Sequence, residues 1–112
     1  MSDNPDIQPE PEQAPADFPI PPATIEFLVL SLKAQAEMHL GLLHFGDEKD
    51  RPQPDLPVAR HTIDILALLE DKTRGNLTMD EQRLLGNSLT ELRFRYVQAV
   101  ESSRKAKAGA QA

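Results

Sequence analysis

The chain has 112 residues, enough for one small domain, and no cysteine, which excludes disulfides, a thiol nucleophile and a cysteine-ligated metal. Its net charge is −6, and five of its 18 acidic residues fall in residues 1–22, which contain no Lys or Arg. The remainder is near neutral and lacks the basic face of a nucleic-acid-binding protein, so we expect no nucleic-acid partner.

Residues 1–22 also hold seven of the ten prolines and few apolar side chains. Such a composition cannot bury enough surface to offset the entropy of ordering, so it predicts a disordered, acidic, Pro-rich tail. The tail lacks the basic and apolar regions of a secretory signal, which favours a cytoplasmic protein. Its one apolar spot, Phe18–Pro22 (FPIPP), either packs lightly on the domain or docks on a partner protein through a polyproline-like backbone.

A first helix is predicted over residues 25–42, with Thr24 as its N-cap. Three charged side chains, Glu26, Lys33 and Glu37, fall on one line of this helix, and we expect that line to face solvent. The polar residues make the stretch too hydrophilic to span a membrane, and a Glu-Lys-Glu polar face does not suit anionic lipid, so we expect no membrane association.

The rest of this helix is apolar over an arc wider than one neighbouring helix would cover, and a second polar line, Ser31, Gln35 and His39, runs within it. A buried polar group without a partner costs about 1–3 kcal/mol, so this line needs hydrogen-bond partners. We therefore predict that the core is completed between two copies in a two-fold symmetric homodimer. The candidate dimer face consists of Leu28, Ser31, Leu32, Gln35, Ala36 and His39.

A polar, solvated loop is predicted at residues 44–53, followed by a second helix over residues 56–73. The helix has an N-cap, a first-turn proline and a terminating Gly-Asn pair, and a Thr/Glu capping box then opens the next helix. Because the stop and the start lie within about five residues, the second and third helices are predicted to form an antiparallel hairpin. These structural residues are Asp55, Pro57, Gly75, Asn76, Thr78 and Glu81.

A third helix is predicted over residues 79–102, within a helical domain that spans residues 23–102. Its apolar residues follow a 4-3-4-3 spacing, the heptad pattern that packs one helix along another at a shallow angle. From residue 103 to 112 the composition turns to Ala, Lys and Gly, and a disordered tail is predicted. The seam of the third helix is Leu85, Leu89, Leu92, Tyr96 and Ala99.

Three separated blocks of the sequence are distinctive: SLKAQAEMHLGL (31–42), PDLPVARHTIDILALLEDKTRGNLTMDE (54–81) and LRFRYV (92–97). In this order they resemble a family of small bacterial proteins known as domain of unknown function eighteen-forty-four. The resemblance covers roughly residues 24–100. It implies a short helical protein without an established activity, and it supplies no catalytic residues to assign.

One constellation could carry chemistry. His61 and Asp64 stand three residues apart on the second helix, where a carboxylate can orient an imidazole, and His39 on the first helix could join them as a metal ligand. A carboxylate-bridged di-metal bundle would carry Glu-x-x-His motifs, and none is present in the sequence, so hydrogen bonding within or between helices is the simpler interpretation.

The sequence therefore predicts an all-α protein: a three-helix unit that completes its core as a helical-bundle homodimer. The favoured function is a non-enzymatic interaction or dimerisation module without a cofactor, which meets a partner protein through its tail or an apolar groove. The alternative is a bundle that binds a small molecule or a metal through His39, His61 and Asp64, with possible enzymatic activity.

Overall fold

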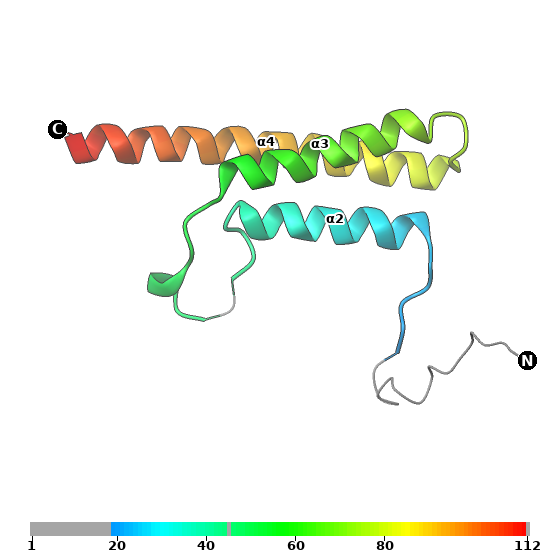
Figure 1. The fold of residues 1–112 in the computed structure, drawn as a ribbon, viewed down its shortest axis with the longest axis horizontal. Coiled ribbons are helices and arrows are strands. Elements are labelled where there is room, and N and C mark those ends of the chain that lie inside the picture. The colour runs from blue at the N-terminus through cyan, green and yellow to red at the C-terminus, as the bar shows by residue number, and fades with distance from the viewer. Residues whose placement is uncertain (1–18, 45, 112) are drawn as a thin grey trace, which may run out of the picture.

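The structure is a computed structural model that describes residues 19–44 and 46–111 (Figure 1). Over these residues it contains three α-helices, one short 3-10 helix and no strand, which confirms the predicted all-α class. The predicted tail falls largely on residues 1–18, outside the described residues, while residues 19–23 are exposed and have no regular secondary structure. In chain order the elements are α2 (Ile25–His39), η1 (Glu48–Asp50), α3 (Leu56–Lys72) and α4 (Met79–Gln111).

Helix α2 begins and ends with local hydrogen bonds. The Phe27 N–H donates to Thr24 Oγ1 at 3.0 Å, so Thr24 is the N-cap. At the other end Gly41 has a φ of +80°, its N–H donates to the Met38 carbonyl at 3.0 Å, and the Leu42 N–H donates to the Glu37 carbonyl at 2.8 Å. This is the closure typical of a left-handed glycine, and it ends the helix at residue 39 rather than at the predicted residue 42.

Asp55 joins the end of α2 to the start of α3. Its Oδ1 accepts from the Val58 N–H at 3.3 Å, which caps α3, and Pro57 lies in the first turn. Its own N–H donates to the His39 carbonyl at 2.7 Å, one of the carbonyls that a helix C-terminus leaves without a partner. The two helix ends are therefore held together through one residue.

Helices α3 and α4 are connected by a short turn, after which α4 runs back alongside α3 (Figure 1). Gly75 has a φ of +84° in this turn, a conformation that glycine adopts without strain. The Thr78 N–H donates to Glu81 Oε1 at 2.8 Å and the Glu81 N–H donates to Thr78 Oγ1 at 3.1 Å, a reciprocal capping box at the start of α4.

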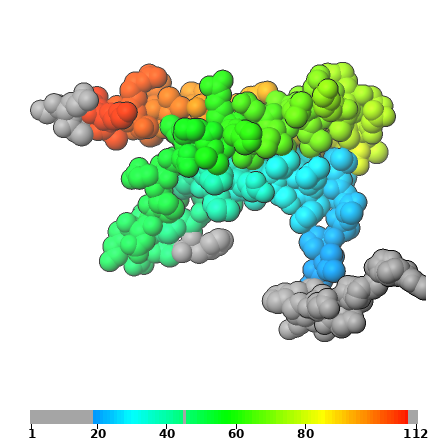
Figure 2. Space-filling model, in the orientation of Figure 1, coloured from blue at the N-terminus to red at the C-terminus, as the bar shows by residue number. Residues whose placement is uncertain are grey.

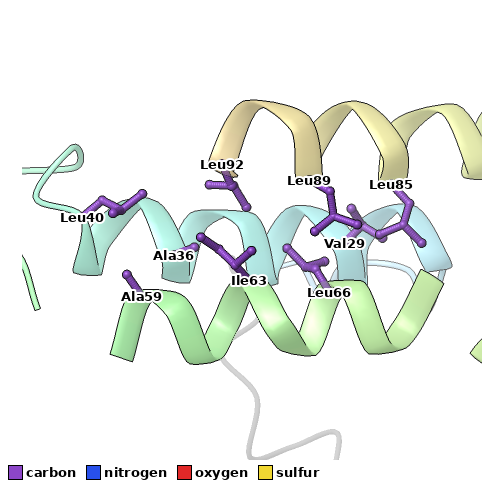
Figure 3. Close-up of a cluster of buried hydrophobic side chains, with 9 residues drawn as sticks. All are labelled: Val29, Ala36, Leu40, Ala59, Ile63, Leu66, Leu85, Leu89 and Leu92. Atoms are coloured by element: carbon purple, nitrogen blue, oxygen red, sulfur yellow. The ribbon is translucent and has the colours of Figure 1, made fainter. Parts of the chain in front are cut away.

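The core lies where α4 faces both other helices (Figure 3). Leu85, Leu89 and Leu92 are at most 1% exposed, while Tyr96 and Ala99, the last two residues of the predicted seam, are half-buried at the edge of the core. The buried apolar residues are Val29, Ala36, Leu40, Ala59, Ile63, Leu66, Leu85, Leu89 and Leu92.

Helix α4 continues to Gln111 and passes the ends of both other helices (Figure 1), so the predicted disordered tail at residues 103–111 is wrong. The segment contains no proline and is rich in Ala, Lys and Arg, all good helix formers, and Arg104 Nη1 lies 3.3 Å from Glu101 Oε2. We call residues 100–111 the α4 overhang; its side chains are exposed from residue 101 to 109. No helix among the described residues is long and apolar enough to cross a bilayer.

Two leucines on α3 provide a matched test of this core. Leu66 is fully buried and Leu68 is 55% exposed. We expect Leu66→Ala to lower the free energy of unfolding by about 2–5 kcal/mol, because it removes buried contacts and leaves a cavity. The control Leu68→Ala should change it by no more than about 1 kcal/mol. Urea denaturation followed by circular dichroism measures both, and equal losses would contradict the assigned packing of α3.

Candidate interaction surface

Helix α2 is apolar on two opposite sides, and only one of them faces the core. Val29 and Ala36 are fully buried, whereas Phe27 is 46% exposed, Leu30 48% and Met38 53%. At about 100° per residue the three exposed side chains fall within about 80° of one another, on the side of α2 opposite the core. We call Phe27, Leu30 and Met38 the outer face of α2.

The charged line of α2 lies at the boundary with α4. Lys33 Nζ is 3.2 Å from Glu91 Oε1 of α4 and 3.6 Å from Glu37 Oε2. The side chains of Lys33 and Glu37 are only 23% and 20% exposed, and Glu26 is half-buried. The expectation that this line marks the solvent side of α2 is therefore wrong, because the ion pair to α4 holds it against the bundle.

The predicted dimer face divides between the core and the surface. Ala36 is fully buried within the chain and Leu32 packs against the same core, so neither presents a free face. Leu28 and Gln35 are exposed, and the remaining members of the predicted face, Ser31 and His39, are half-buried. The side of α2 that the structure leaves apolar and uncovered is rotated by roughly 120° from the predicted face.

The residues proposed for a metal site lie in different environments. His61 and Asp64 are exposed on α3, and His39 is half-buried at the end of α2. Within residues 19–44 and 46–111, no three His, Asp or Glu side chains gather as metal ligands.

The loop between α2 and α3 is folded around Arg51 rather than simply solvated. The guanidinium of Arg51 donates to the Gly41 carbonyl and to both carboxylate oxygens of Glu48, at 2.7 Å and 3.0 Å. The hydrogen bond from Arg51 lowers the pKa of Glu48, and the same bond raises the pKa of Arg51. These contacts fix the loop against the C-terminal end of α2.

Two hollows flank α4. The smaller, about 240 Å³, lies between α3 and α4 and is lined by Arg60, Arg93 and Tyr96 among others. The larger, about 480 Å³, lies between the loop before α3 and the α4 overhang, and we call it the overhang groove. The overhang groove is lined by Leu40, Pro54, Leu56, Ala99, Ala106 and Lys107, together with Gln53, Ser102 and Ser103.

Comparison with family models identifies the family of the chain. A family model described as "Domain of unknown function (DUF1844)" matches residues 22–98, more than half of the 112 residues. The chain belongs to this family. Searches of curated proteins and of solved structures returned no match. The DUF1844 region contains the core and the outer face of α2, and the α4 overhang lies outside it.

Sequence reasoning missed two features of this DUF1844 protein. The outer face was visible as a line of Phe27, Leu30 and Met38 on a helical wheel, but nothing local showed which side of α2 the other helices cover. The overhang groove forms between segments about 50 residues apart, such as Pro54 and Ala106, so no local pattern indicates it.

The pair of Glu48 and Arg51 predicts a pH dependence. Because the pKa of Glu48 is lower in the folded chain than its usual value of 4.5, the pair stabilises the fold above that value, and this contribution is lost as the pH falls through the depressed pKa. We expect the difference in thermal midpoint between wild type and Glu48→Gln to shrink from pH 6 to pH 3. Asp50→Asn, in the same 3-10 helix, is the control and should show no such convergence. If the difference in thermal midpoint between wild type and Glu48→Gln stayed constant from pH 6 to pH 3, the pair of Glu48 and Arg51 would be contradicted.

Proposed function

We propose that this DUF1844 protein is a non-enzymatic interaction module that forms a homodimer through the outer face of α2. The observation that carries the proposal is the exposure of Phe27, Leu30 and Met38, each about half exposed on a helix whose opposite side is fully buried. Contiguous apolar patches exposed on a soluble protein mark binding sites or surfaces prone to association.

The uncovered apolar surface is concentrated at α2. Of the twelve large apolar side chains that are clearly exposed in the described residues, seven lie on α2 or within five residues of its ends. Fully burying one such side chain stabilises a complex by about 1.5–3 kcal/mol. Burying a side chain that is already half-buried contributes roughly half of that free energy. Two copies of the outer face bring six side chains together, enough to support association. The seven are Ile20, Phe27, Leu28, Leu30, Met38, Leu42 and Leu43.

A second copy suits this surface because one apolar helix face can pair with itself about a two-fold axis. In this proposal the antiparallel hairpin of α3 and α4 is the scaffold that holds α2 in place from behind. A binding role is favoured over a catalytic one because the main surface feature is apolar. The candidate ligands do not share one environment, since His61 and Asp64 are exposed on α3 and His39 is half-buried at the end of α2. We place the dimer in the cytoplasm on the basis of its cysteine-free composition.

Light scattering of the full chain after gel filtration, over a concentration series, tests the dimer. We expect wild type to have twice the mass of one chain and Leu30→Glu to be monomeric, because the symmetric interface would bury two carboxylates without partners. Leu68→Glu is the matched control, since Leu68 is similarly exposed on α3 and should leave the dimer intact. Circular dichroism checks that the variants remain helical. A monomeric wild type, or a dimeric Leu30→Glu, would overturn the proposal.

A further inference from the structure

The chain carries opposite charges at its two ends. Residues 1–18 contain five carboxylates and no Lys or Arg, a charge of −5, and the α4 overhang has Arg104, Lys105 and Lys107 against Glu101, a charge of +2. The stretch before α2 and the α4 overhang lie toward opposite ends of the described part of the chain (Figures 1 and 2). A charge distribution of this kind favours one relative orientation of two copies over the other.

Two helices can pair about a two-fold axis in a parallel or an antiparallel manner. Parallel pairing of α2 would place the two segments of charge −5 side by side at one end and the two overhangs of charge +2 at the other. Antiparallel pairing instead places each acidic segment beside the basic overhang of the other copy. Coulomb repulsion thus opposes the first arrangement, and attraction supports the second.

We propose that the two chains pair antiparallel and that the N-terminal segment of each, residues 1–23, docks on the overhang groove and the α4 overhang of its partner. This inference rests on the dimer proposed above and adds its orientation and a second contact. The occupant of the overhang groove is thus a named segment of a second copy of this chain.

An apolar anchor is available for this docking. Ile20 is 79% exposed, the most exposed of the large apolar side chains in the described residues, and it lies in an extended stretch before α2. The overhang groove has an apolar wall made by Leu40, Pro54 and Leu56. Because Leu40 is at the C-terminal end of α2, antiparallel pairing brings the stretch before α2 of one copy close to the overhang groove of the other.

The N-terminal segment is long enough to reach along the α4 overhang of the partner. From Ile20 in the groove, a chain with a reach of about 3.3 Å per residue can span about 10 Å to Asp17 and about 26 Å to Glu12. The overhang, residues 100–111, is about 18 Å long as an α-helix. The carboxylates from Glu12 to Asp17 can therefore lie along the amines of Lys105 and Lys107, of which Lys107 also lines the groove.

A zero-length carbodiimide cross-linker, which joins a carboxylate to an amine in direct contact, tests the contact in the full chain. Equal amounts of ¹⁵N-labelled and unlabelled chains are mixed, cross-linked and digested. We expect peptides from residues 1–18 joined to Lys105 or Lys107, with one heavy and one light member, which identifies a link between chains. Lys72 is the matched control, because it is exposed at the end of α3, near the end from which a chain's own N-terminal segment departs.

Substitutions test how much this docking contributes to the affinity of the dimer. We expect Ile20→Ser to raise the dissociation constant of the dimer at least about fiftyfold by sedimentation at low salt, because each dimer would lose two buried side chains. Lys105→Gln with Lys107→Gln should weaken the dimer at low salt and have little effect at 1 M salt, where charges are screened within about 3 Å. Met79→Ser is the matched control, because Met79 is 73% exposed at the N-terminal end of α4, far from the overhang. This substitution should leave the dissociation constant of the dimer unchanged.

The outcomes separate the two proposals. A stable dimer without links between residues 1–18 and the partner's overhang, or with links only within one chain or to Lys72, overturns this inference and leaves the α2 dimer standing. A protein that is monomeric at all concentrations overturns both. A dimer with inter-chain links, weakened by Ile20→Ser and not by Met79→Ser, supports both.

Discussion

The structure depends on the leucines of α4 packing against α2 and α3 at the same time. Leu85, Leu89 and Leu92 are almost completely buried, and each of the other two helices contributes only a few residues opposite them. A core of this size gives a small domain only modest stability, so the helix ends must also be well satisfied. Asp55 meets part of this need, since it caps α3 and its N–H donates to the last turn of α2. The capping box of Thr78 and Glu81 does the same for α4.

The same packing determines which surface remains for binding. A helix in a three-helix arrangement contacts two neighbours along adjacent sides, and the ion pair of Lys33 with Glu91 places α4 on one of these sides of α2. The remaining side is therefore free, and in this chain it is occupied by Phe27, Leu30 and Met38 instead of polar residues. An apolar outer side adds nothing to the stability of a single chain and exposes it to association, which is why we propose that the chain binds through this surface.

Features that depend on a few neighbouring residues could be predicted from the sequence, and features that depend on the placement of distant segments could not. The caps at Thr24, Asp55 and Thr78, and the leucine seam, arise from local hydrogen bonds and helical periodicity. The orientation of α2 depends on where α3 and α4 lie, so the apolar arc was found but its free side was misplaced by roughly 120°. The helical overhang was missed because alanine- and lysine-rich ends resemble disordered tails, although their residues also favour helix.

The proposed assembly divides affinity and orientation between different parts of the chain. Apolar contacts between two outer faces are non-directional, and they allow parallel and antiparallel pairing with similar energy. Charges at the two ends of the chain are distant from that interface, and exposed charges contribute little affinity of their own, but they distinguish the two orientations. The family match covers residues 22–98, which include α2 and the core, while the charged ends lie outside it. A dimer that forms through the matched region and is oriented by its flanking segments accounts for both the apolar outer side of α2 and the helical overhang, neither of which the fold of one chain requires.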